Sequence, residues 1–161
     1  MSLEGSTAPD FTLRNTAGDE VTLSATLDSG PSVVITFRGT WCSFCAEQLQ
    51  TFSNLAYDMH RHQGVDVLPV AGASVGDLAA MRDLYDLRIQ LLADPTFEVT
   101  RAYAGVREHP DHGRHTRAGT FLVDPTGTVR HEYLADHSAD RRYANFFRYL
   151  IDNDYEDEYF G

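Results

Sequence analysis

The chain has 161 residues and a formal net charge of −11 at pH 7, because 24 Asp and Glu residues face 13 arginines and no lysine. Its length predicts one compact domain, for which we expect residues 1–152, followed by an acidic tail at 153–161. The charge excludes binding to nucleic acid or to an anionic membrane surface, since these carry the same sign. No apolar run approaches the roughly 20 residues that a membrane helix needs.

Two further features indicate where such a protein would work. The N-terminal residues lack the charged-then-apolar pattern of a signal peptide, which predicts a cytoplasmic location. An excess of acid without lysine is typical of proteins kept soluble in concentrated salt, where screening weakens self-repulsion, so we expect a halophilic microbial origin. Only two cysteines are present, which excludes the disulfide framework of small secreted proteins.

The first third of the chain changes from strand to helix patterns. Short alternating segments at 11–13 and 21–23 flank a turn and predict a β-hairpin. Residues 32–37 are almost continuously apolar and β-branched, which is typical of a strand buried on both faces of a parallel sheet. From 42 to 62 apolar residues recur at three- and four-residue spacing, which predicts a helix that ends at Gly64.

The middle of the chain repeats this alternation. Residues 65–71 read as a second buried strand. Ser74, with an acidic residue three positions later, predicts the start of a helix that runs to about Leu87. A third strand is expected at 89–93, followed by a short helix at 96–103.

The last third is expected to begin with a polar loop at 106–119. Strands at 120–123 and 129–134 then flank a turn and predict a second hairpin, and a final helix is expected to start near Ser138. Strand–helix alternation with right-handed crossovers gives an α/β fold, with a central sheet covered by helices on both faces.

The chemistry of the chain concentrates at Cys42 and Cys45, a C-x-x-C pair between a buried strand and a long helix. The helix N-terminus stabilises an anion, so the first thiol is expected to have a lowered pKa and to act as the nucleophile. Cys45, one turn deeper, would then resolve a mixed disulfide. Two buried structural cysteines are the alternative.

A metal site is a second alternative for the same cysteines. Structural zinc needs about four ligands, and no second C-x-x-C exists in the chain. His109, His112 and His115 could complete a copper or zinc site if the fold brought this His-rich loop to the cysteines. A solvated loop is the simpler interpretation of these histidines.

Three motifs, taken together, resemble the alkyl hydroperoxide reductase/thiol-specific antioxidant family, the peroxiredoxin-like part of the thioredoxin-fold superfamily. They are the segments 8–13, 38–45 and 120–127, in that order, and the similarity extends over roughly 8–135. The resemblance implies a thioredoxin-like fold, in which helices flank a central mixed β-sheet, with an N-terminal β-hairpin extension. It also implies thiol-based redox activity.

The resemblance indicates candidate site residues, and the spacing of some of them differs from the family pattern. Thr40 lies two residues before Cys42, one short of the peroxiredoxin spacing, and Trp41 would shield the site. Arg117 is the candidate for the arginine that polarises peroxide, although it stands four residues before Phe121 instead of three. No proline precedes the second hairpin, where thioredoxin-like proteins place one. If Cys45 is aligned with the peroxide-attacking cysteine of peroxiredoxins, Cys45 attacks first, instead of Cys42.

The function expected from these features is a thiol oxidoreductase that uses the C-x-x-C dithiol to reduce peroxides or disulfides. A thioredoxin- or glutaredoxin-like donor would recycle it, and no organic cofactor is needed because sulfur carries both electrons. A homodimer is compatible with the resemblance. The alternatives are the metal-binding or metal-delivery module described above and a redox-inert interaction domain.

Overall fold

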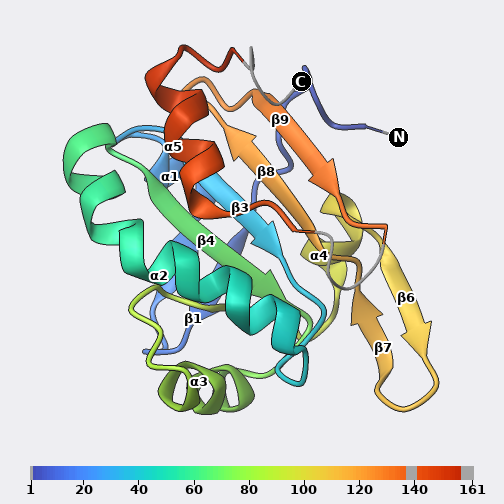
Figure 1. The fold of residues 1–161 in the computed structure, drawn as a ribbon. Coiled ribbons are helices and arrows are strands. Elements are labelled where there is room, and N and C mark those ends of the chain that lie inside the picture. The colour runs from blue at the N-terminus through green and yellow to red at the C-terminus, as the bar shows by residue number, and fades with distance from the viewer. Residues whose placement is uncertain (1, 137–140, 157–161) are drawn as a thin grey trace.

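The computed structural model describes residues 2–136 and 141–156. In this part of the chain the strands are β1 (Thr12–Asn15), β2 (Glu20–Thr22), β3 (Ser32–Thr36), β4 (Asp66–Ala71), β5 (Leu92–Ala93), β6 (Val106–His109), β7 (Gly113–Thr116), β8 (Gly119–Val123) and β9 (Val129–Leu134). The helices are α1 (Leu23–Thr26), α2 (Ser43–Gln63), α3 (Val75–Leu84), α4 (Glu98–Tyr103) and α5 (Ala144–Asp152). Seven strands form one sheet in the order β2-β1-β5-β4-β3-β8-β9, and β6 pairs only with β7 (Figure 1).

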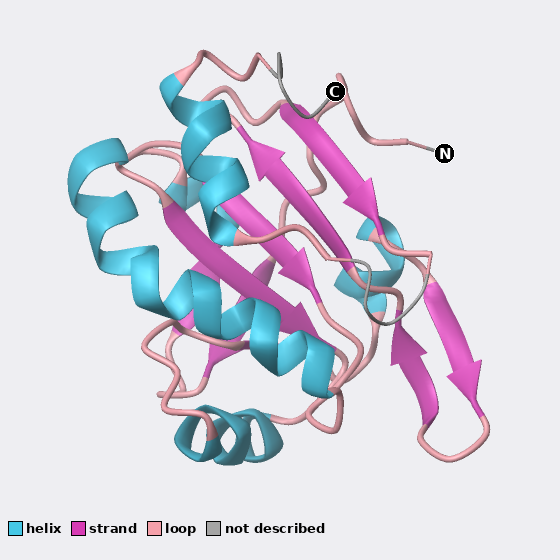
Figure 2. Ribbon diagram, in the orientation of Figure 1, coloured by secondary structure: helices cyan, strands magenta, loops and turns pink. Residues whose placement is uncertain are grey.

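The large sheet has helices on both faces (Figure 2), as the strand–helix alternation predicts. Strand β3, in the interior of the sheet, runs parallel to β4 and antiparallel to β8. Val33 and Ile35 point into the core shared with α2 and α5, whereas Val34 points into the core on the opposite face. Because both faces of β3 are buried, its sequence is continuously apolar rather than alternating.

The N-terminal hairpin is confirmed, and it extends the sheet at one edge. β1 pairs antiparallel with β2 and, on its other side, with β5. The side chain of Asn15 closes the turn between the two strands by accepting hydrogen bonds from the backbone N–H groups of Ala17 and Asp19, both at 3.0 Å. This local bonding is the reason that asparagine favours such turns.

Helix α2 crosses one face of the sheet and presents its first turn at the carboxyl end of β3 (Figure 1). Leu49, Phe52 and Met59 are fully buried against the sheet. Gly64 ends the helix in the left-handed conformation, with φ of 69°, as the sequence predicts. No helix in the described ranges is both long and apolar enough to cross a bilayer.

The prediction of a polar loop at 106–119 is wrong, because this segment forms the β6–β7 hairpin. Val106 pairs with Thr116, and His109 with Gly113, in an antiparallel register. The hairpin projects from the body of the molecule (Figure 1), and most of its residues are exposed or half-buried. The residues that the hairpin buries, His115 and Thr116, are polar, so the segment lacks the alternation of apolar and polar residues by which strands are recognised in a sequence.

Several predicted boundaries also differ. The strand expected at 89–93 pairs only over β5, and α3 ends at Leu84 rather than near Leu87. Ser138 lies outside the described residues, but residues 141–143 are not helical, so the last helix starts at Ala144. Within the predicted acidic tail, Tyr155 packs 4.7 Å beneath the guanidinium of Arg130, while 157–161 lie outside the described residues.

Candidate active site

The two cysteines lie at the junction where β3 leads into α2. Cys42 is the N-cap of α2, and its Sγ accepts a hydrogen bond from the backbone N–H of Cys45 at 3.3 Å. The positive end of the helix dipole lies at this terminus and favours a negative charge on the sulfur. Both thiols are free and buried, with exposed fractions of 3% for Cys42 and 0% for Cys45.

The two thiols have opposite pKa shifts. A hydrogen bond from the Cys45 thiol is the largest influence on Cys42 and, together with the Cys45 backbone N–H, Arg141 and Arg38, outweighs burial and lowers its pKa to about 5. Burial, reinforced by this bond to Cys42, raises the pKa of Cys45 well above its usual range. At neutral pH Cys42 is therefore a thiolate and Cys45 a thiol. This arrangement fits the expected order of attack, with Cys42 first.

Arg141 is the site residue that the sequence analysis misses. Its Nη2 lies 3.3 Å from Sγ of Cys45 and 3.7 Å from Sγ of Cys42, and the residue is 7% exposed. A guanidinium at these distances, in a site with little water, stabilises negative charge on either sulfur. The residue is therefore placed to serve both thiols.

Contacts between α2 and the segment before α5 hold Arg141 in place. Nε2 of Gln48 donates a hydrogen bond to the carbonyl oxygen of Arg142 at 2.8 Å. The N–H of Ala144 reaches Oγ1 of Thr51 at 3.4 Å, and the rings of Phe52 and Phe147 pack 5.7 Å apart. No local pattern in the sequence marks Arg141, since only this packing carries it to the cysteines across 96 residues.

The residues immediately before Cys42 form a tight turn that positions Trp41. The guanidinium of Arg38 lies 4.7 Å from the centre of the indole ring, and the Arg38 backbone N–H donates to Sγ of Cys45 at 3.4 Å. A Cβ added to Gly39 would lie 2.5 Å from Nε1 of Trp41, so only glycine fits beneath the ring. Thr40 is half-buried and, among the described residues, makes no hydrogen bond to either sulfur.

Arg117 is near the site, but the structure does not bring its side chain into contact with the cysteines. Its Nε donates to the carbonyl oxygen of Ala135 at 3.0 Å, and its Nη2 pairs with Asp136 at 3.4 Å. The backbone of Arg117 does reach the strand below the site, because its carbonyl oxygen accepts a hydrogen bond from the buried Thr36 hydroxyl at 2.9 Å.

The predicted His-rich loop gathers on Trp41 rather than on the sulfurs. The ring of His112 stacks on the indole with centroids 3.9 Å apart and an interplanar angle of 4°. His109 and His115 lie 5.4 Å and 5.9 Å from the same ring. No group of three His, Cys, Asp or Glu side chains in the described part of the chain is arranged to hold a metal ion.

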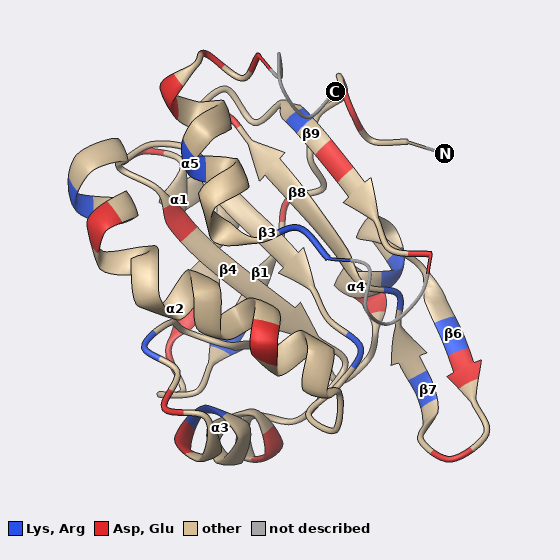
Figure 3. Cartoon of the chain, viewed as in Figure 1, with Lys and Arg blue, Asp and Glu red and all other residues tan. Residues whose placement is uncertain are grey.

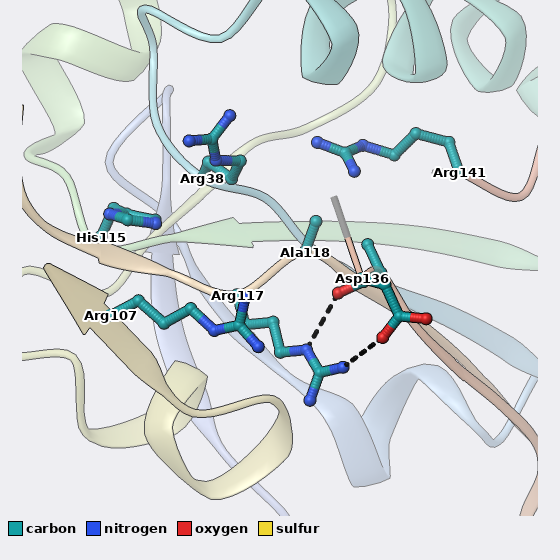
Figure 4. A pocket seen from close by; sticks show the side chains of 8 residues that line it. Arg38, Arg107, His115, Arg117, Ala118, Asp136 and Arg141 are labelled. Atoms are coloured by element: carbon teal, nitrogen blue, oxygen red, sulfur yellow. Dashed lines mark hydrogen bonds and ion pairs between the residues drawn. The ribbon is translucent and has the colours of Figure 1, made fainter. Parts of the chain in front are cut away.

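A cavity of about 250 Å³ lies next to the cysteines through Arg141, which contacts both sulfurs, and half of its described lining residues are arginines (Figure 4). Two of its lining residues, Arg38 and Arg141, also lower the pKa of Cys42 through their charge. The lining residues are Arg38, Arg107, His115, Arg117, Ala118, Ala135, Asp136 and Arg141. Burial, followed by repulsion from neighbouring cations, lowers the pKa of His115, so its imidazole is neutral at pH 7.

Comparison with known proteins places this geometry in context. Residues 5–132 match the model of the AhpC/TSA family. The chain is 33% identical over 127 residues to thiol-disulfide oxidoreductase ResA of Geobacillus thermodenitrificans, a match that covers 78% of this chain and 66% of the relative. It is 26% identical over 130 residues to the putative chloroplastic peroxiredoxin Q of Oryza sativa subsp. indica, covering 81% and 58% of the two chains. The chain thus spans less than two thirds of the length of these relatives.

Solved structures establish the fold. Peroxidoxin BcpB from Mycobacterium tuberculosis superposes with a TM-score of 0.75 at 19% identity, over 94% of this chain and 92% of the other. The reduced 2-Cys peroxiredoxin of Plasmodium vivax gives a TM-score of 0.77 at 18% identity, over 94% and 96% of the chains. The expected thioredoxin-like α/β fold, with a central mixed sheet and flanking helices, is confirmed.

Proposed function

The chain belongs to the AhpC/TSA family, and on that basis we propose that it is a thiol oxidoreductase that reduces disulfides or peroxides through Cys42 and Cys45. The observation that supports this proposal is the polarised thiol pair. Cys42 has a pKa of about 5 at the start of α2, while the Cys45 thiol donates a hydrogen bond to it. A strong nucleophile and its resolving thiol are thus already in contact.

The reaction with a disulfide proceeds in two exchanges. The Cys42 thiolate attacks one sulfur of the substrate, a mixed disulfide forms, and the first substrate thiolate leaves. Cys45 then loses its proton and attacks Sγ of Cys42, which releases the second substrate thiol and closes the Cys42–Cys45 disulfide. The two cysteines supply two electrons, and a thioredoxin- or glutaredoxin-like dithiol from outside would restore them.

The reaction with a peroxide differs only in its first intermediate. The Cys42 thiolate attacks one oxygen, the O–O bond breaks, and the second oxygen leaves as an alcohol or water, with Cys42 as the sulfenic acid. Cys45 condenses with this sulfenic acid, water is lost, and the same disulfide forms. Both substrates therefore lead to one oxidised state of the protein.

Proton release from Cys45 is the demanding step, since burial raises its pKa. A carboxylate in contact with the thiol could accept this proton, but no carboxylate in the described residues bonds to either sulfur. The residue on β3 is Thr36, which is not an acid, and Glu47 on α2 is exposed. We assign charge stabilisation in this step to Arg141. Once Cys42 is a neutral mixed disulfide, the positive charge of Arg141, 3.3 Å from Sγ of Cys45, favours the thiolate of Cys45 and so lowers the pKa of that thiol.

Trp41, the sole tryptophan of the chain, provides the test. Reduced protein in concentrated salt is mixed rapidly with hydroxyethyl disulfide or with hydrogen peroxide while indole emission is followed. We expect a second-order rate far above that of free cysteine for at least one oxidant, and the faster oxidant defines the substrate class. Rates no better than free cysteine with both oxidants would overturn the proposal.

Two variants identify the attacking residue in the same experiment. Cys45→Ser is expected to stop at the mixed disulfide or sulfenic acid, because the nucleophile remains but the resolving thiol is gone. Cys42→Ser is expected to be inert, since the remaining Cys45 thiol is buried with a raised pKa. Sulfenic acid formation by Cys42→Ser would instead make Cys45 the attacking residue.

A further inference from the structure

The cavity beside the cysteines collects positive charge in a protein that is otherwise acidic. Among the described residues, four of the 13 arginines of the chain line it, against one carboxylate, although the formal net charge is −11. In Figure 4 these side chains come from the residues after β3 and β7, from strand β6 and from the segment before α5, with Arg141 directed toward Arg38 and Arg117 turned toward Asp136. In Figure 3 acidic residues are spread over α2, α3 and β9, and one lies on β6.

Stabilisation of the Cys42 thiolate explains only two of these four arginines. Arg38 and Arg141 act on the sulfurs and lower the pKa of Cys42. Arg107 and Arg117 have no such contact among the described residues. Arg117 reaches one carboxylate, that of Asp136, whose side chain is 87% exposed. The guanidinium groups of Arg107 and Arg117 therefore line the cavity without acting on the sulfurs.

Arg107 is the clearest member of this second pair. It extends from β6 into the cavity wall, and no carboxylate in the described part of the chain forms an ion pair with it. Its charge, after burial and the charge of Arg38, is among the influences that lower the pKa of His115. Such a cluster is stabilised when an anion enters and occupies the space between the guanidinium groups.

We propose that this cavity binds the carboxylate groups of the oxidised substrate, so that the preferred substrate is a small organic disulfide that carries carboxylates. This inference rests on the proposed function, because it specifies the substrate of the same thiol pair. Guanidinium groups bind carboxylates through paired hydrogen bonds, which orient the ligand as well as attract it. The cavity volume of about 250 Å³ suits a small molecule.

The carboxylates take no part in the bond changes. Held by Arg107 and Arg117, they bring the disulfide to the side of the cavity where Arg38 and Arg141 meet the cysteines. Cys42 attacks the nearer sulfur and the first carboxylate-bearing thiolate leaves. Cys45 then attacks Sγ of Cys42 and displaces the second thiol, so two electrons pass from the dithiol to the two product thiols and the Cys42–Cys45 disulfide remains.

Three small disulfides that share two methylene groups between each sulfur and its polar group, but differ in charge, test the proposal. Dithiodipropionate is a dianion, hydroxyethyl disulfide is neutral and cystamine is a dication. Each rate with the reduced protein is divided by the rate of the same disulfide with free mercaptoethanol at the same ionic strength, which removes intrinsic reactivity. We expect dianion over neutral over dication, with about tenfold or more between the extremes. A flat or reversed order would overturn the proposal.

Two variants locate the effect. Arg107→Gln is expected to reduce the dianion-to-neutral ratio by about threefold or more, since it removes one cation from the cavity. Arg88→Gln is the matched control because it changes the net charge equally at a side chain that is 80% exposed and outside the cavity. An equal change of the ratio in both variants would show that only net charge matters, which overturns the assignment of the cavity.

A binding measurement separates this inference from the proposed function. Suberate is the all-carbon counterpart of dithiodipropionate and cannot react, so calorimetry reports its binding alone. Binding of suberate that weakens in Arg107→Gln, by a protein that reduces no disulfide or peroxide, would support the cavity and overturn the proposed function. Rapid reduction of hydroxyethyl disulfide, with no charge preference and no suberate binding, would support the function and overturn the cavity.

Discussion

Nη2 of Arg141 lies 3.3 Å from Sγ of Cys45, although 96 residues separate the two in the sequence. The same nitrogen is 3.7 Å from Sγ of Cys42, so one guanidinium bridges the nucleophile and the resolving thiol. Because Arg141 is almost fully buried, water screens this interaction weakly. The first three predictions below follow from this charge and from the paired thiols beside it.

Replacing Arg141 by glutamine removes the cation without a large change of volume. We expect the pKa of Cys42 to rise by roughly one to three units, because an opposite charge within hydrogen-bond distance is lost. Ultraviolet titration of the thiolate measures this shift. Arg141→Lys should recover part of it, and Arg88→Gln should leave it unchanged. A pKa of Cys42 equal in Arg141→Gln and wild type would contradict the role of Arg141.

The Cys45 thiol is predicted to lower the pKa of Cys42 by donating a hydrogen bond, which is the largest single influence on that group. Cys45→Ser keeps a donor at this position, whereas Cys45→Ala removes it. We therefore expect a higher Cys42 pKa in Cys45→Ala than in Cys45→Ser. The pH dependence of alkylation by iodoacetamide gives both values, and identical profiles would contradict this mechanism.

The stability of the reduced protein should depend on pH through Cys42. Its pKa falls from 9.0 to about 5 on folding, so between these values the unfolded chain binds more protons than the native one. The free energy of unfolding should therefore increase with pH in this window, by at most about 1.4 kcal/mol per pH unit, and the gain is lost as pH falls through 5. Above pH 9 the raised pKa of Cys45 has the opposite effect.

Urea denaturation under reducing conditions at several pH values within this window measures the effect. Cys42→Ser is the reference, since it lacks the titrating thiol but keeps every other ionisable group. The free energy of unfolding of the wild type, minus that of Cys42→Ser, should increase as the pH rises from 5 toward neutral. A constant difference across the window would show that Cys42 has an ordinary pKa in the folded protein.

His112 is predicted to shield Trp41, since the two rings are stacked 3.9 Å apart. In His112→Ala, water replaces the imidazole, so the emission of Trp41 should shift to longer wavelength and acrylamide should quench it more strongly. The lost ring contact is expected to cost roughly 1 kcal/mol of stability. His60→Ala, at an exposed position of α2, is the control. Unchanged quenching in His112→Ala would mean that the hairpin does not rest on the indole in solution.

The acidic composition predicts that concentrated salt stabilises the protein. Self-repulsion among 24 acidic side chains weakens as the screening length shortens to roughly 3 Å at 1 M salt. The melting temperature should therefore rise from dilute buffer to molar potassium chloride, and by more than in sucrose, which is uncharged. A melting temperature that is highest in dilute buffer would contradict the prediction of a halophilic origin.

Local patterns in the sequence were sufficient for most of the fold. The continuous apolar run of β3, the spaced apolar residues of α2 and the glycine at position 64 each identify an element, because burial and backbone conformation restrict the residue types at those positions. The β6–β7 hairpin escaped recognition, since it lies outside the large sheet and its buried residues, His115 and Thr116, are polar. The chemistry of Cys42 and Cys45 was also readable, because a C-x-x-C pair at a helix start depends only on neighbouring residues.

What the sequence by itself determined is therefore the fold class and the thiol pair, while it left open which of the two thiols attacks first. Only the tertiary structure decided which cations accompany them. It brought Arg141 to both sulfurs, kept the side chain of Arg117 away from them and placed the histidines around Trp41. A charge on a distant segment leaves no periodic or motif signal, because its position depends on how α5 and the hairpin pack against the rest of the chain.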